Sequence, residues 1–136
     1  MFIGRYEYSI DDKRRVSIPA KFREALSLSA DSRLILTILD GCIAAYPYQE
    51  SLQIQNNISA SGPKSKEQRA FLRYFFAGAT ECAFDKLGRV LIPQALKTDA
   101  QIQKNVVIVG VGKKIEVWAK EKWEELVRIA TADPDQ

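Results

Sequence analysis

The stretch DDKRRVSIP at residues 11–19 recurs as DKLGRVLIP at residues 85–93, 74 positions further along the chain. The two stretches share the pattern Asp-x-x-x-Arg-Val-x-Ile-Pro, with five of nine positions identical. Further on, the apolar run Leu34–Leu36 matches Val106–Ile108 at an offset of 72. The small difference in length falls in a connecting loop, where it costs little. The chain is therefore a tandem duplication.

Each copy predicts the same set of short strands. Aromatic and polar residues alternate ahead of each Asp-x-x-x-Arg turn, which is typical of a strand. Asp40-Gly41 between two apolar runs predicts a tight hairpin, and Gly88 in the second turn can adopt a positive φ without a Cβ penalty. The predicted strands are Arg5–Ile10, Val16–Ile18, Leu34–Leu39 and Ile43–Tyr46 in the first copy, and Thr80–Phe84, Val90–Ile92, Val106–Val111 and Ile115–Trp118 in the second.

Helices are predicted beside these strands. Proline is favoured at the first turn of a helix, because the N–H that it lacks would have no partner there. The segment 66–77 is apolar over much more than one stripe, so its helix is either deeply buried or shared with another subunit. The predicted helices begin at Pro19 and Pro93 and run to about Leu26 and Leu96, and others cover about Gln49–Ile58, Lys66–Ala77 and Lys120–Thr131.

The duplication predicts an α+β fold with a pseudo-symmetric core. A module of about 45 residues buries little apolar surface alone. Two copies must therefore pack on each other, on another chain, or on both. We divide the chain into a first repeat (residues 5–50), a linker with a helix (51–78), a second repeat (79–122), and a C-terminal helix and tail (123–136).

The composition argues against an enzyme. The chain contains no histidine, so the usual general base and the commonest metal ligand are both missing. Cys42 and Cys82 stand far apart and form no metal-binding or redox motif. We therefore predict no catalytic residue, metal, cofactor or small-molecule substrate. No apolar run approaches the ~20 residues that cross a bilayer, and the N-terminus lacks the pattern of a signal peptide, so a cytosolic protein without a membrane partner is expected.

The positive charge gathers at the front of the chain. Residues 1–23 hold six cations against three anions, although the whole chain carries only +3. Lys13, Arg14 and Arg15 are adjacent in the first turn, and their mutual repulsion argues against a purely structural role for all three. A polyanion would relieve it, since arginine binds phosphate through two parallel hydrogen bonds. The candidate DNA-binding residues are Arg5, Lys13, Arg14, Arg15, Lys86 and Arg89, and the candidate turn-bracing residues are Asp11, Asp85 and Gly88.

A structural interpretation of the same residues stays open. Asp11 and Asp85 can accept hydrogen bonds from backbone N–H groups two or three residues on. Arg15 and Arg89 could pair with these aspartates and brace the turns. The second turn carries only Lys86 and an arginine, so we expect it to bind weakly or to serve mainly assembly.

The opening Met-Phe-x-Gly, the two nine-residue stretches and the Tyr46-Pro47 pair resemble the MraZ family of bacterial transcriptional regulators. The resemblance covers essentially the whole chain, including its duplication. It implies AbrB/SpoVT-type modules in a swapped-hairpin β-barrel with flanking helices. It also implies a cytoplasmic, nucleoid-associated regulator of its own division and cell-wall gene cluster. Repression is the expected mode of regulation. Such a protein forms a homo-oligomeric ring and binds direct repeats in double-stranded promoter DNA.

The first turn departs from the family pattern at one position. The family's motif is usually Asp-x-Lys-Gly-Arg, and Arg14 replaces its glycine here. If the turn keeps a positive φ, arginine costs roughly 1 kcal/mol or more at this position. Lys13 occupies the usual lysine position of the motif.

Three other functions are alternatives to DNA binding. The first is a structural or protein-binding ring-forming oligomer whose basic turn engages an acidic partner. The second is an enzyme that uses carboxylates, which the missing histidine disfavours. The third is an AbrB-like antitoxin, but such proteins usually carry a single copy and a disordered toxin-binding tail.

Overall fold

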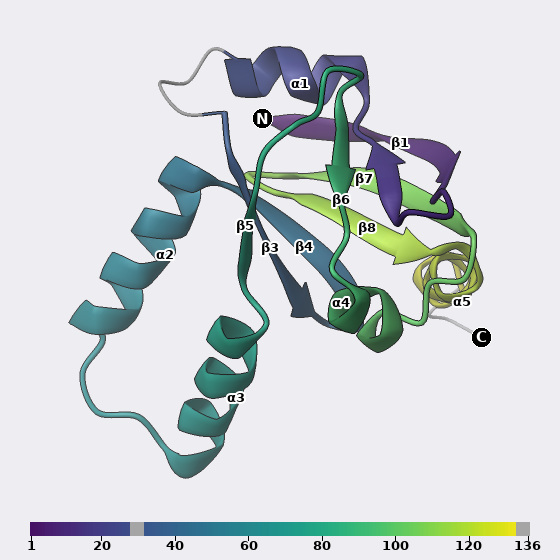
Figure 1. Ribbon diagram of the computed structural model, residues 1–136. Helices are drawn as coiled ribbons and strands as arrows, with labels where there is room; N and C mark the ends of the chain where they lie inside the picture. Colours follow the sequence, from purple (N-terminus) through teal and green to yellow (C-terminus); the bar gives the residue numbers. More distant parts are fainter. Residues whose placement is uncertain (28–31, 133–136) are drawn as a thin grey trace.

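The computed structural model describes residues 1–27 and 32–132, so the end of the predicted C-terminal tail, residues 133–136, lies outside the described residues. The fold is α+β, with antiparallel strands and five helices in the described chain (Figure 1). In chain order the elements are β1 (Phe2–Ser9), β2 (Arg15–Ser17), α1 (Ala20–Ser27), β3 (Leu34–Leu39), β4 (Cys42–Pro47), α2 (Tyr48–Ala60), α3 (Lys66–Ala77), β5 (Thr80–Cys82), β6 (Arg89–Leu91), α4 (Gln94–Asp99), β7 (Asn105–Gly112), β8 (Ile115–Ala119) and α5 (Lys120–Ala130).

The two repeats interleave in one antiparallel sheet, whose strand order is β1-β7-β8-β4-β3-β5. β1 of the first repeat pairs with β7 of the second along its whole length, from Phe2 opposite Gly112 to Ser9 opposite Asn105. β5 of the second repeat pairs in turn with β3 of the first. The strand order is therefore unchanged when the two repeats are exchanged. Among the described strands, β1 and β5 form the two edges of the sheet, and closure into a barrel stays a prediction.

A separate two-stranded ribbon, β2–β6, also takes one strand from each repeat. Val16 and Val90 stand opposite each other in it, and both side chains are buried in the main core. Ile18 and Ile92, which end the matching stretches, lie in the same core. The matching positions of the duplication thus lie together in the main core.

α1 and α4 contribute Phe22, Leu26 and Leu96 to the main core, whereas α2, α3 and α5 cover the opposite face of the sheet. The rings of Trp118 and Trp123 contact each other where α5 packs on β8, with centroids 6.1 Å apart and planes inclined by 58°. α2 and α3 cover a second apolar cluster that contains Tyr46 and Phe75. Of the α3 side chains only Phe75 is buried, and its other large aromatic residues are exposed. Of the two alternatives predicted for α3, deep burial within its own chain is therefore excluded, and contact with another subunit stays a prediction.

Two predicted strand boundaries were wrong by two residues or more, and several others by one residue. β1 begins at Phe2 rather than Arg5, because β7 offers it a partner along its whole length. β5 ends at Cys82 rather than Phe84, because β3 pairs with only three of its residues. The hairpin at Asp40-Gly41 is confirmed, with φ of 54° and 81° at the two residues. No helix in the described part of the chain is long and apolar enough to cross a membrane.

Candidate functional site

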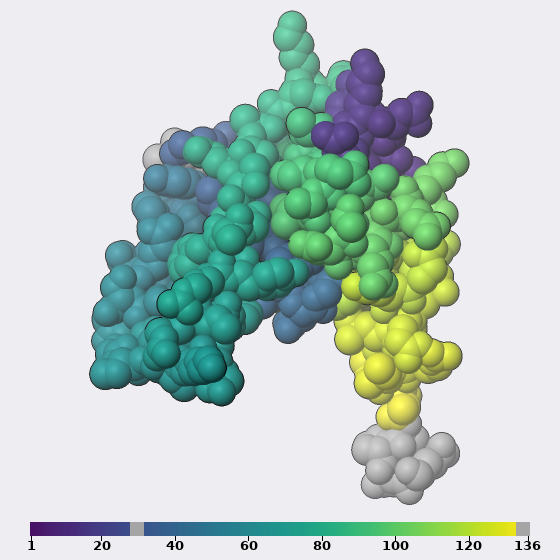
Figure 2. Space-filling view, turned by 60° about the horizontal axis from the view of Figure 1, so that its bottom comes forward, coloured from purple at the N-terminus to yellow at the C-terminus, as the bar shows by residue number. Residues whose placement is uncertain are grey.

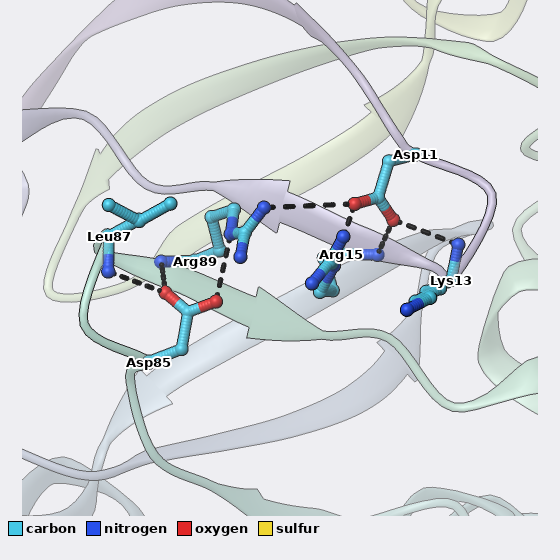
Figure 3. A network of polar contacts seen from close by, with 6 residues as sticks. All are labelled: Asp11, Lys13, Arg15, Asp85, Leu87 and Arg89. Carbon is cyan, nitrogen blue, oxygen red and sulfur yellow. Dashed lines mark hydrogen bonds and ion pairs between the residues drawn. The ribbon is translucent and has the colours of Figure 1, made fainter.

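Asp11 organises the first turn (Figure 3). Its Oδ1 accepts hydrogen bonds from the backbone N–H groups of Lys13 at 3.0 Å and Arg15 at 2.8 Å. Its Oδ2 accepts a third hydrogen bond from the Nε–H of Arg15 at 2.7 Å. These donors favour the ionised carboxylate, and the backbone N–H of Arg15 is the strongest of the causes that hold the pKa of Asp11 below its ordinary value.

Asp85 organises the second turn in the same way. Its Oδ1 accepts from the backbone N–H groups of Leu87 and Arg89, both at 2.9 Å, and its Oδ2 accepts from the Nε–H of Arg89 at 2.8 Å. The backbone N–H of Arg89 is again the main cause that lowers the pKa of the carboxyl group. The two turns of the duplication therefore have the same hydrogen-bond pattern, atom for atom.

The turns retain the backbone conformation that glycine favours. Gly88 has φ of 76°, and Arg14, at the matching position, has φ of 62°. The Nε–H of Arg14 donates to the carbonyl of Ile92 at 3.0 Å, and the backbone N–H of Ile92 donates to the carbonyl of Arg14 at 2.7 Å. Arg14 thus has a binding partner in the second repeat, which helps to offset the cost of its positive φ.

The matching carbonyl in the first repeat is bound by a different arginine. Arg23 of α1 donates its Nε–H to the carbonyl of Ile18 at 3.1 Å, and Ile18 donates its N–H to the carbonyl of Gly88 at 3.1 Å. A Cβ at position 88 would lie 2.6 Å from the guanidinium carbon of Arg23. The side chain of Arg23 therefore occupies the space that Gly88 leaves open.

Arg23 was not among the candidate site residues. The residue that matches it in the second repeat is Lys97, so the alignment of the repeats gave no sign of its role. The only available signal was its place in the basic segment before residue 24.

The ribbon joins the two turns. Arg15 and Leu91 are opposite each other at one end of it, and Ser17 and Arg89 at the other, so one turn lies at each end. The Nη1 of Arg89 also lies 3.9 Å from Oδ2 of Asp11, which extends the ion pairs of Figure 3 from one repeat to the other. The turns and the ribbon thus form a single unit, which we call the turn–ribbon unit: residues 11–17 and 85–91.

Five of the six candidate DNA-binding residues lie in this unit. The ammonium groups of Lys13 and Lys86 are exposed, and neither has a polar partner among the described residues. Arg15 and Arg89 hold their aspartates through Nε, and their side chains are still 34% and 25% exposed. Two of the three adjacent cations of the first turn therefore have protein acceptors, which explains how their mutual repulsion is tolerated.

Arg5 lies apart from the turn–ribbon unit. It lies on β1, where the alternating Tyr6 and Tyr8 pack against the main core. Arg5 instead lines a pocket between β1 and α5, together with Glu7 and Trp123. The indole N–H of Trp123 is buried there without a hydrogen-bond partner among the described residues.

An antiparallel sheet shared by two tandem repeats, each with its own Asp-x-x-x-Arg turn, defines a class of duplicated α+β proteins. The family model described as "MraZ protein, putative antitoxin-like" matches residues 1–74 and again residues 75–135. The chain belongs to the MraZ family.

Curated relatives agree over most of the chain. It is 43% identical to the transcriptional regulator MraZ of Pediococcus pentosaceus over 128 residues, which cover 93% of this chain and 87% of the relative. Proteins of the same name from Clostridium tetani and Caldanaerobacter subterraneus are 44% and 45% identical, over 92% of this chain and 86% and 85% of their own. These matches identify the chain as a member of a family of transcriptional regulators.

Proposed function

We propose that the protein is a sequence-specific DNA-binding regulator that represses transcription and acts through the turn–ribbon unit. The observation that carries this proposal is the pair of like turns, one at each end of a single ribbon, that display exposed cations. The names of its relatives support a role in transcription. By resemblance to the family, its target is double-stranded DNA with direct repeats ahead of its own division and cell-wall gene cluster, and its location is the cytoplasm and nucleoid.

Each cation of the unit has a distinct role in this proposal. Lys13 and Lys86 bind backbone phosphates as point charges, since no side chain or carbonyl among the described residues holds their ammonium groups. Arg15 and Arg89 are fixed at Nε by aspartate, and the Nη1 of Arg89 also lies 3.9 Å from Oδ2 of Asp11. The terminal nitrogens of Arg15 and the Nη2 of Arg89 are left to meet the DNA. Arg14 chiefly keeps the first turn in shape through Ile92. Arg5 lies outside the turn–ribbon unit, so it would contact only DNA that extends past this unit.

A single chain has one turn–ribbon unit, so oligomerisation would multiply the contacts. Figure 2 shows the α2–α3 hairpin and α5 as two separate projections, and both expose large apolar side chains. Two different apolar patches on one chain favour head-to-tail contacts, which close into a ring when the rotation allows it. We propose a homo-oligomeric ring on this basis, built from swapped-hairpin modules with the repeat boundaries predicted above. The exposed residues are Phe71, Tyr74 and Phe76 on α3 and Leu126 and Ile129 on α5.

Competition binding tests the proposed DNA specificity. The purified protein is bound to labelled DNA from upstream of its own gene, and unlabelled DNA of the same or of shuffled sequence competes. We expect the upstream sequence to compete at a concentration at least tenfold lower. Equal competition would contradict sequence-specific binding and would favour the alternative of a structural or protein-binding oligomer.

Native mass spectrometry tests the ring. Phe71→Ser and Tyr74→Ser remove exposed aromatic rings from α3, so the monomer should remain folded. We expect these changes to shift the assembly toward smaller species, whereas the exposed control Gln53→Ser on α2 should not. An unchanged mass for both α3 variants would contradict the proposed contact.

A further inference from the structure

The ribbon has one face in the core and one in solvent. Side chains alternate along a strand, and Val16 and Val90 occupy the buried face. The solvent face therefore carries the neighbours of these valines on both strands. The four residues are Arg15 and Ser17 on β2 and Arg89 and Leu91 on β6.

This solvent face is chemically unequal at its two ends. Leu91 occupies the position that Ser17 occupies in the first repeat. An arginine stands opposite each of them, so one end presents an arginine with a leucine and the other an arginine with a serine. Leu91 is 52% exposed, between two ionised turns. The ribbon therefore has a direction, although the backbone around it is nearly symmetric.

Base edges offer a partner for this arrangement. The major groove of DNA admits a two-stranded ribbon, and thymine presents its methyl group there. The groups beside Leu91 fit the same groove, because arginine binds the edge of guanine or a phosphate. An exposed leucine surrounded by charged groups is well placed to contact a thymine methyl as the cations bind the DNA.

We propose that Leu91 is a specificity-determining residue that contacts a thymine methyl group in the major groove, and that the difference between Leu91 and Ser17 sets the orientation of the ribbon on its site. This inference rests on the proposed DNA-binding function. An oriented ribbon suits a series of sites that all point the same way. Such a series does not require the exact two-fold symmetry of a palindrome.

Replacement of thymine by uracil tests this contact, because it removes only the methyl group and leaves base pairing intact. The DNA is the upstream region of the protein's own gene, with one thymine replaced at a time. At the contacted thymine, the wild-type protein should lose about fourfold in affinity, the effect of one buried methyl group. Leu91→Ala should bind thymine and uracil DNA at that position equally well.

Leu87→Ala is the matched control. Leu87 is the other exposed leucine of the unit, at 69%, but it lies at the tip of the second turn rather than on the ribbon face. We expect its thymine-to-uracil affinity ratios to equal those of the wild-type protein. Thermal unfolding of both variants checks that they remain folded.

Three results would overturn the inference. The first is that Leu91→Ala keeps the wild-type thymine-to-uracil ratio at every position. The second is that Leu91→Ala changes the mass of the assembly but not these ratios, since Leu91 is then a subunit contact. The third is that the wild-type protein binds none of the DNA, which would contradict the proposed function as well, whereas the first two would leave that function intact.

Discussion

Arg14 and Ile92 exchange two hydrogen bonds, one between backbone groups at 2.7 Å and one from the Arg14 Nε–H to the Ile92 carbonyl at 3.0 Å. The first turn is thereby fixed by a residue of the second repeat. Since Arg14 has a positive φ, its unfavourable backbone conformation and its favourable side-chain contact oppose each other. Substitutions at this position can separate the two contributions.

We expect Arg14→Ala to lower the free energy of unfolding by about 1–2 kcal/mol, because it removes a charge-assisted hydrogen bond and keeps a Cβ at positive φ. Arg14→Gly loses the same hydrogen bond but relieves the backbone, so it should be about 1 kcal/mol more stable than Arg14→Ala. Denaturation in urea measures both. Equal stability of the two variants would show that the positive φ costs nothing here.

Gly88→Ala should lower the free energy of unfolding by more than the cost of a positive φ alone. The new Cβ would displace the guanidinium of Arg23 and weaken its hydrogen bond to Ile18. Gly62→Ala is the matched control, since Gly62 has φ of 81° and no atom near its absent Cβ. We expect Gly88→Ala to be less stable than Gly62→Ala by about 1 kcal/mol. In the Arg23→Ala background this difference should largely disappear, and a difference that persists would rule out Arg23 as its cause.

Gly110→Ala should disrupt the pairing of the two repeats. A Cβ at position 110 would lie 2.4 Å from the backbone carbon of Phe2 and 2.5 Å from the backbone nitrogen of Ile3, so β1 would have to separate from β7. We expect the free energy of unfolding to fall by about 3 kcal/mol or more. Amide hydrogen exchange along β1 measures the effect locally. Gly112→Ala, which has open space at its Cβ and bears only the cost of its φ of 79°, is the control. Full protection of β1 in Gly110→Ala would contradict the pairing.

The aspartate hydrogen bonds of the two turns should stabilise the fold at neutral pH but not in acid. The pKa values of Asp11 and Asp85 are lowered in the folded protein, chiefly by backbone N–H donors. A lowered pKa stabilises the fold above the unfolded value of about 3.9, and this contribution disappears as the pH falls through the folded value. The double variant Asp11→Asn/Asp85→Asn should therefore lose less stability than the wild type between pH 5 and pH 2. Denaturation at each pH measures this.

Asp12→Asn is the control for that series. Asp12 is exposed, and its carboxylate accepts no hydrogen bond among the described residues. It should therefore leave the wild-type pH dependence intact. A double variant with the same pH dependence as Asp12→Asn would contradict the role of the two carboxylates.

Local patterns in the sequence predicted much of this structure. The aspartate hydrogen bonds span only two to four residues, so the repeated motif was enough to place Asp11 and Asp85 at the turns. The strand pairs between the repeats depend on packing over long separations, which periodicity does not report. The roles of Arg14 and Arg23 could not be predicted from the sequence either. Each binds an isoleucine carbonyl, but the matching residues of the second repeat are Gly88 and Lys97, so the alignment of the repeats does not indicate the contact.

The most direct test of the central claim is the salt dependence of DNA binding by Lys13→Ala. Each phosphate contact contributes about 0.9 to the slope of log K against log salt. We predict that Lys13→Ala lowers the slope by at least that amount. Lys113→Ala, at an exposed site beside the opposite end of β1, should keep the wild-type slope. Binding that does not respond to salt, or a slope that Lys13→Ala leaves unchanged, would contradict phosphate binding by the first turn.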